Sequence, residues 1–191
     1  GGDLNIGTVI SGGNARLAAA SSILAASGAG SLKVGGDLVL LAGTGNLGTT
    51  VTDKMLSLDV AGRLLSASAG QHIGLRWLGD DFRIGRIFAV GDLRLDAPNG
   101  SLLGQFEGLT VTGQSIRLNA RDNILGLNGA ALVIDQASLD GELDASAGGD
   151  IRLSDTGALR AGLIRAGGNL YLDAQSTLSG RDLQAGGDLQ L

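Results

Sequence analysis

Short runs of apolar and polar residues alternate along the whole chain. Ile151 and Leu153 fall on one face of such a run, and Leu170 and Leu172 repeat them one period later. Alternation with a period of two indicates strands, because successive side chains of a strand point to opposite faces. We therefore predict about three short strands in each repeat, separated by turns at Gly, Asn, Asp or Ser.

One phrase recurs along the chain. The triplet Gly-Gly-Asp or Gly-Gly-Asn occurs six times, ending at Asp3, Asn14, Asp37, Asp150, Asn169 and Asp188. An apolar-x-apolar pair usually follows, and from Leu38 onward such pairs recur every 16 to 23 residues, with the last three steps each 19 residues long. Short strands and tight corners at a period near 19 residues predict a parallel β-helix in which each repeat is one coil. About nine or ten coils, spaced by roughly 4.8 Å, would form a rod roughly 45 Å long.

The corners account for the glycines in this prediction, because Gly adopts positive φ without steric cost. An Asp or Asn after the glycine pair can accept a hydrogen bond from a backbone N–H, so stacked corners are expected to form ladders along the rod. A lone coil buries too little apolar surface to fold, and neighbouring coils are therefore required. The chain starts and stops on the repeat phrase, so residues 1–191 are predicted to be one β-helix segment cut from a longer solenoid.

Composition narrows the classes of partner. The net charge is −5 and the 14 basic residues are scattered, which argues against nucleic acid, because phosphate contacts require clustered Lys and Arg. No apolar run is long enough to span a bilayer. The absence of cysteine excludes disulfides and thiolate metal sites. Aromatic residues make up only 3% of the chain, so Leu, Ile, Val and Ala must fill the core.

The pattern GGDLxL…A…G…L…AGGDLxL, clearest over residues 148–191, resembles the haemagglutinin-type repeats of filamentous haemagglutinin and related large Gram-negative exoproteins. These include two-partner-secretion adhesins and the stalks of contact-dependent inhibition toxins. The resemblance covers essentially the whole chain and implies a right-handed parallel β-helix used mainly as a shaft. It also implies export through an outer-membrane transporter of the two-partner type. The family's Asn-Pro-Asn secretion motif is absent, and the nearest string, Ala97-Pro98-Asn99-Gly100, is predicted to be a turn.

Few residues suggest catalysis or metal binding. His72 is the only histidine and, without a second His or a Cys, is predicted to be an exposed corner residue. Asp80 and Asp81 could supply half of an acid–base pair, but adjacent strand residues point to opposite faces, which favours a solvated turn after Gly79. The Gly-Gly-Asp phrase also differs in spacing from calcium-binding nonapeptide repeats. We predict no catalytic residue, no metal site and no cofactor, and we expect that the protein is not an enzyme.

The stretch RWLGDDFRIGRIFA, residues 76–89, differs from the rest. It holds three of the five aromatic residues interleaved with arginines, namely Arg76, Trp77, Phe82, Arg83, Arg86 and Phe88. On a rod surface this combination is typical of a contact with protein or glycan, and Phe106 lies about one coil further on. In the alternative, Phe82, Ile84 and Phe88 face the core while Arg83 faces solvent. The sequence favours this internal alternative.

Together these features predict the structural shaft of a large secreted or surface-exposed Gram-negative adhesin that supports attachment to host cells. The expected partners are neighbouring coils of the parent protein and the two-partner transporter. One alternative is that the segment itself binds host glycan or protein through residues near 76–106. Another is a β-helical polysaccharide-degrading enzyme, for which no cluster of ionisable residues can be assembled. Neither nucleic acid nor a membrane span is expected.

Overall fold

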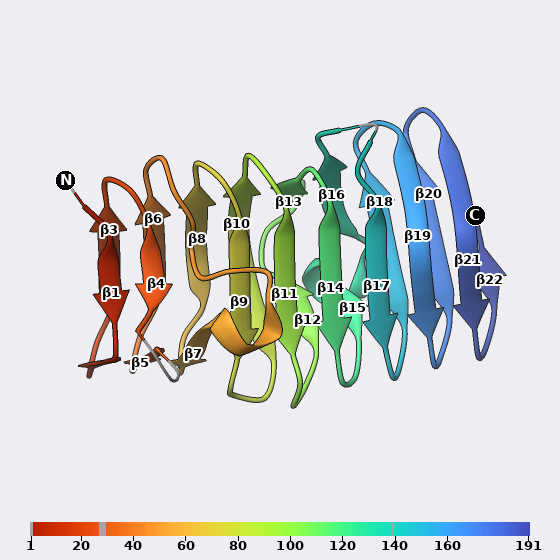
Figure 1. Cartoon of the computed structure of the whole chain (residues 1–191). Coiled ribbons are helices and arrows are strands. Elements are labelled where there is room, and N and C mark those ends of the chain that lie inside the picture. The colour runs from red at the N-terminus through yellow and green to blue at the C-terminus, as the bar shows by residue number, and fades with distance from the viewer. Residues whose placement is uncertain (1, 27–29, 139) are drawn as a thin grey trace.

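Nine coils of the chain stack along one axis, with the two ends of the chain at opposite ends of the stack (Figure 1). The computed structural model describes residues 2–26, 30–138 and 140–191. Within these ranges the strands pair in parallel, and successive coils lie roughly 21 residues apart. The helical elements described are two three-residue 3-10 turns, η1 (Thr52–Lys54) and η2 (Leu127–Gly129). The predicted all-β parallel β-helix is confirmed, with a coil somewhat longer on average than the predicted one.

Each coil contributes to two long sheets. The nine-stranded sheet contains β2 (Thr8–Ser11), β5 (Ser31–Val34), β7 (Leu56–Val60), β9 (Ile73–Trp77), β11 (Leu93–Ala97), β14 (Ile116–Ala120), β17 (Leu143–Ala147), β19 (Leu159–Ala166) and β21 (Leu178–Ala185). The eleven-stranded sheet contains β3 (Ala15–Ala19), β6 (Leu38–Ala42), β8 (Leu64–Ala69), β10 (Phe82–Ala89), β12 (Leu102–Gly104), β13 (Leu109–Gly113), β15 (Ile124–Leu125), β16 (Leu132–Gln136), β18 (Ile151–Asp155), β20 (Leu170–Ala174) and β22 (Leu189–Gln190). A small third sheet pairs β1 (Leu4–Ile6) with β4 (Ile23–Ala25).

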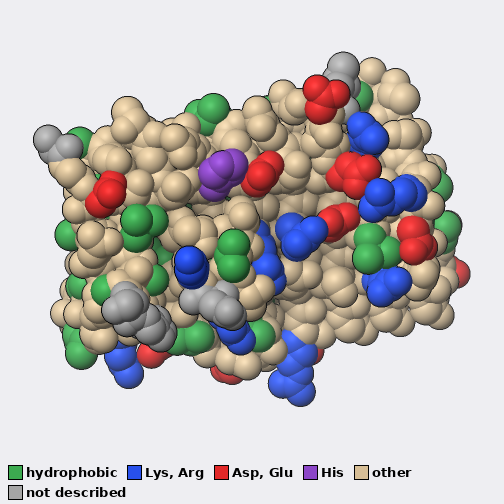
Figure 2. Space-filling view, viewed as in Figure 1, with side chains coloured by type: hydrophobic (Ala, Val, Ile, Leu, Met, Phe, Trp, Pro, Cys, Tyr) green, Lys and Arg blue, Asp and Glu red, His purple; other side chains and the backbone are tan. Residues whose placement is uncertain are grey.

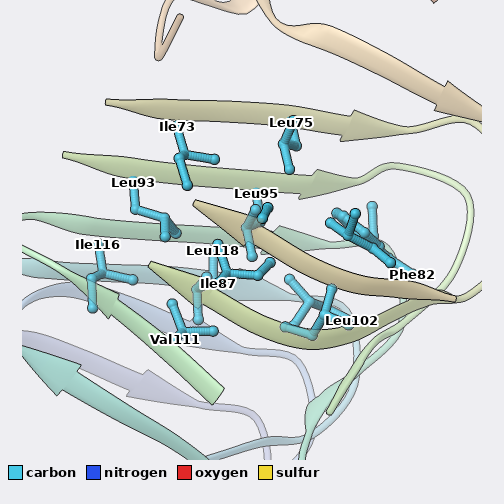
Figure 3. Packing of buried hydrophobic residues seen from close by; sticks show 14 of the residues in the cluster. Ile73, Leu75, Phe82, Ile87, Leu93, Leu95, Leu102, Val111, Ile116 and Leu118 are labelled. Atoms are coloured by element: carbon cyan, nitrogen blue, oxygen red, sulfur yellow. The ribbon is translucent and has the colours of Figure 1, made fainter. Parts of the chain in front are cut away.

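Inward-facing side chains stack in columns from coil to coil (Figure 3). Ile73, Leu93 and Ile116 are paired in register and form one column in the nine-stranded sheet. Phe82 and Leu102 form another in the eleven-stranded sheet. All five side chains are at most 1% exposed and belong to one apolar cluster that runs through the coils. Because each coil completes the burial of its neighbours, the coils stabilise one another.

The register corrects part of the predicted repeat. Leu38 and Leu56 were expected to be successive, but they lie in different sheets, and Leu38 pairs with Leu64. The expected step from Ile116 to Leu132 is wrong for the same reason. The last two steps, from β18 to β20 and from β20 to β22, are confirmed. Apolar-x-apolar pairs open strands of both long sheets, so sequence alternation alone does not identify the sheet in which a pair lies.

From the second coil onward, the glycine pairs of the repeat phrase are required by close packing and not by backbone conformation. Among the glycines described, positive φ occurs at Gly48, Gly108 and Gly129. None of these belongs to a Gly-Gly-Asp or Gly-Gly-Asn phrase, so the prediction of positive φ at those corners is wrong. A Cβ at Gly167 would overlap the carbonyl oxygen of Gly148 one coil earlier, and a Cβ at Gly168 would overlap Oδ1 of Asp150. The glycine pair allows successive corners to stack at the spacing of paired strands.

Candidate functional site

A ladder of side-chain hydrogen bonds follows one corner of the first coils. Asp3 Oδ1 accepts from the backbone N–H of Ser22 at 2.9 Å, and Ser22 Oγ accepts from Asn46 at 3.1 Å. Asn46 Oδ1 accepts from the N–H of His72 at 2.9 Å, and His72 Nδ1 accepts from the N–H of Asp92 at 2.9 Å. This bond requires that Nδ1 carry no proton. His72, with 44% of its side chain exposed, is the corner residue that the sequence predicted.

A second ladder follows another corner through the later coils. Its members, in order, are Asp81, Ser101, Asn123, Asp150, Asn169 and Asp188. Each side-chain oxygen accepts a hydrogen bond from the backbone N–H of the next member, at 2.7 to 3.3 Å. The predicted ladder of Asp and Asn corners is confirmed, and Asp81 begins it in the predicted turn. These bonds satisfy corner N–H groups that strand pairing does not reach.

Further polar contacts occur where the chain enters the eleven-stranded sheet in the first coils, and at a third corner. Asn14 Oδ1 accepts from the N–H of Asp37, whose Oδ1 accepts from the N–H of Arg63. The backbone N–H and the guanidinium of Arg63 hold the pKa of Asp37 below its usual value. At a third corner Asp155, which is 1% exposed, accepts from the N–H groups of Gly157 and Gln136. Burial raises the pKa of Asp155 despite these two bonds.

The residues of the 76–89 stretch that were candidates for a contact with protein or glycan do not share one surface. Some lie in the interior and others on the outer faces of the two long sheets. Trp77 and Phe82 are 2% and 0% exposed, and their rings stack with centroids 4.6 Å apart. The internal alternative is therefore confirmed for Phe82, and Trp77 is buried as well, so neither ring can contact a partner. Arg76 lies on the outer side of β9 in the nine-stranded sheet, whereas Arg83 is exposed on β10 in the eleven-stranded sheet.

Phe88 corrects the internal alternative, because it is 48% exposed beside Arg86 on β10. The inward positions of β10 are Ile84 and then Ile87, three residues later, so the alternation shifts phase at the buried Gly85. A Cβ at Gly85 would approach the ring of Phe106 at 2.9 Å, which shows that this ring lies over the outer surface of β10. Phe88 and Phe106 are thus both partly exposed.

The middle of the nine-stranded sheet carries a groove of about 600 Å³ on its outer face. Charged side chains gather on this side of the molecule (Figure 2). The groove is lined by four arginines and one carboxylate, namely Arg76, Arg94, Arg117, Arg121 and Asp96, together with Thr52, Asn119 and an apolar strip of Ala97, Pro98 and Ala120. Its lining is positively charged, although the net charge of the chain is −5.

Arg94 organises this groove. Its Nε and Nη2 donate to Asp96 Oδ1 and Oδ2 at 3.1 and 2.8 Å, and the two side chains are only 16% and 13% exposed. Its Nη1 donates to Thr50 O at 3.2 Å and to Thr52 Oγ1 at 2.9 Å, which holds residues 50–52 as one wall of the groove. Gly74 permits this arrangement, because a Cβ there would overlap the carbonyl of Thr49.

Two arginines of the groove lack a close carboxylate. Arg76 makes no hydrogen bond or ion pair within the described part of the chain, and its Nε is buried without a partner. Within the described residues, the Arg121 side chain pairs with Asp122 alone, at 3.9 Å, and 69% of it is exposed. By contrast, Arg117 Nη2 contacts Asp144 Oδ2 at 2.8 Å. Arg76 therefore supplies a guanidinium without a carboxylate partner in the described part of the chain, and Arg121 supplies an exposed one that is only loosely paired.

An acidic hollow of about 430 Å³ adjoins the groove, with Arg94 and Arg117 lining both. Its other charged residues are Asp92, Asp140, Glu142 and Asp144. Burial would raise the pKa of Asp144, but the N–H of Leu163 and the guanidinium of Arg117 lower it below its usual value overall. Across the described residues, no group of three or more His, Cys, Asp or Glu side chains has the arrangement of a metal site.

The sequence placed Arg76 in a candidate contact and the alternative binding site near residues 76–106, but it did not assemble the groove. Arg94, Asp96, Arg117 and Asn119 occupy outward positions of two adjacent strands, in the phrases LRLDA and IRLNA. Aligning these strands by register, rather than searching for clustered aromatic residues, would have placed them side by side. The wall at Thr52 could not have been found in this way, because it belongs to a loop outside the repeat.

The predicted turn at Pro98 and Asn99 is confirmed, and Asn99 Nδ2 donates to Leu78 O one coil earlier at 2.9 Å. In the ranges that the structure describes, no helix is long and apolar enough to cross a membrane. Searches for similarity found no matching family model, no matching curated protein and no matching solved structure.

Proposed function

We propose that this chain is part of the shaft of a large secreted or surface-exposed Gram-negative exoprotein that supports attachment to host cells. The observation that carries the proposal is the parallel β-helix of about nine coils, with one apolar cluster along its length. The repeat phrase, which resembles haemagglutinin-type repeats, supports it further. In this proposal the chain acts mechanically and not as an enzyme.

The two corner ladders support a stiff rod. Bending a solenoid requires neighbouring coils to separate on one side, which would break strand pairing and side-chain bonds at the corners. The ladders tie successive coils through steps of 19 to 27 residues, so the corners remain linked even where the coil length changes. A shaft that holds a distal region away from a cell needs this continuity.

Export and display test the proposal directly. The segment is placed between the secretion domain of a two-partner exoprotein and an epitope tag, in cells that carry the cognate transporter. We expect the tag to reach the cell surface, where external protease removes it. A matched Gly167→Val variant, in which the new side chain would overlap the corner one coil earlier, should be exported less efficiently. Retention of the unaltered segment in the periplasm would refute the proposal.

A further inference from the structure

We propose that the groove over β9, β11 and β14 binds a saccharide that carries carboxylate groups, such as a chain containing uronic acid. This goes beyond the shaft role and does not depend on it. The groove volume of about 600 Å³ lies in the range of ordinary ligand sites. Its available charge comes from Arg76 and Arg121, which other side chains leave without a close carboxylate.

The chemistry of the groove fits carboxylates. A guanidinium presents a planar fork that matches a carboxylate through two parallel hydrogen bonds. The Arg94–Asp96 pair already shows this geometry within the groove. Asp96 is fully engaged, because its Oδ1 also accepts from Asn119 Nδ2 at 2.7 Å, so it is held away from an incoming anion. Arg76, which also lines the groove, carries a guanidinium without a carboxylate partner in the described part of the chain.

The spacing of the groove fits a chain with repeated charges. Arg76 pairs in register with Asp96, and Asp96 pairs with Asn119, two residues before Arg121. Arg76 and Arg121 are thus separated by two coil steps, or about 10 Å along the rod axis. A linear saccharide with recurring carboxylates can reach both guanidinium groups. Thr52 and Asn119 offer polar contacts for hydroxyl groups between them.

A saccharide fits this site better than an extended peptide does. Peptides gain much of their affinity on sheets by hydrogen bonding to a free strand edge. The strands below the groove have no free edge, because β9, β11 and β14 are each paired on both sides. Recognition must therefore come from side chains on the sheet face, which suits a ligand with many hydroxyl groups and a few charges.

Calorimetric titration of the 191-residue chain with an oligogalacturonate of defined length tests this inference. We expect saturable binding that disappears with the fully methyl-esterified form of the same oligosaccharide. Arg76→Gln and Arg121→Gln should each weaken binding about tenfold or more, because each removes a charge-assisted contact. The control Arg83→Gln, on the exposed face of the eleven-stranded sheet, should bind as the unaltered chain does.

Several results would overturn the inference. One is the absence of saturable binding at millimolar oligogalacturonate. Another is equal affinity in the unaltered chain and in Arg121→Gln, an exposed substitution that leaves the core intact. A third is equal weakening in Arg83→Gln, which would indicate unspecific attraction. Tighter binding of a sulfated oligosaccharide or of an acidic peptide would assign the groove to a different ligand. None of these results would bear on export of the shaft.

Discussion

The last three coils and the three coils before them follow the same fold with different regularity. From Asp150 to Asn169 and from Asn169 to Asp188 the corner ladder advances by 19 residues each time. In the middle of the chain the same ladder advances by 20, 22 and 27 residues. The core columns and corner bonds nevertheless continue through both regions.

The difference shows where additional residues go. Strand spacing and the columns of inward side chains fix the interior, so surplus residues leave the sheet as loops. The unbroken strand β10 is matched by two strands in the next coil, β12 and β13, with residues 105–108 looping out between them. The loop before β7 crosses the nine-stranded sheet and forms a wall of the groove at Thr52. The regular coils form the rod, and the irregular coils give it surface features.

The largest expected effect is the loss of stability when a buried aromatic residue of the irregular coils is replaced, compared with an exposed one. Trp77→Ala should lower the free energy of unfolding by about 3–5 kcal/mol, because it removes a buried ring that stacks on Phe82. Phe88→Ala, on the outer face of the same coil, should change it by less than about 0.5 kcal/mol. Urea denaturation measures both. Equal losses would mean that the irregular coils do not share the core of the regular ones.

Alanine substitutions at one glycine in each region test how well the regular and the irregular coils tolerate an added side chain. Gly167→Ala should destabilise the whole protein by about 1–3 kcal/mol, because the new methyl group would overlap the backbone of a stacked corner that cannot move alone. Gly74→Ala should instead displace the loop around Thr49, which can move without separating coils. Limited proteolysis would then show faster cleavage at residues 48–55 with a nearly unchanged denaturation midpoint. Gly12→Ala, where a Cβ meets nothing within 4 Å, is the control.

Removing one side chain from the corner ladder of the regular coils should have a smaller effect on stability. Asp150→Ala should cost about 1 kcal/mol, because the N–H of Asn169 loses its acceptor at 2.7 Å. Asp150→Asn keeps an oxygen in place and should remain close to the unaltered stability. Denaturation curves of the two variants compare them under one condition. A loss in the Asn variant as large as in the Ala variant would show that charge, and not hydrogen bonding, matters at this corner.

The smallest expected effect is on the pH dependence of stability, to which two corner carboxyl groups, Asp37 and Asp155, contribute in opposite directions. Folding lowers the pKa of Asp37, so its stabilisation is present above the unfolded pKa of about 3.9 and is lost as pH falls through the folded value. Folding raises the pKa of Asp155, so its contribution is favourable in acid and is lost as pH rises through the folded value.

Denaturation at several pH values tests these signs with Asp37→Asn and Asp155→Asn. On acidification, the stability difference between the unaltered chain and Asp37→Asn should shrink. For Asp155→Asn, the advantage of the unaltered chain should grow as the buried carboxyl becomes protonated. If the stability differences of the two variants changed with pH in the same direction, the opposite pKa shifts of Asp37 and Asp155 would be contradicted.

Sequence alone determined the parallel strands, the coils, the corner ladders and the turn at Pro98, because these depend on local alternation and on a short phrase that repeats. It also favoured inward positions for Phe82 and Ile84, which are both fully buried. It misjudged Phe88, because the inward phase shifts at Gly85, and it assigned positive φ to corners where the glycines are needed for close packing.

Tertiary structure alone decided which strands share a sheet and which outward side chains become neighbours. Apolar-x-apolar pairs occur in strands of both long sheets, so the partner of Leu38 could not be identified before the coils were stacked. The groove depends on this register, since Arg76, Arg94 and Arg117 come together only when three successive coils are aligned and the loop at Thr52 folds over them. Residues about 20 positions apart become neighbours at strand spacing, and that distance is set by packing and not by the local sequence.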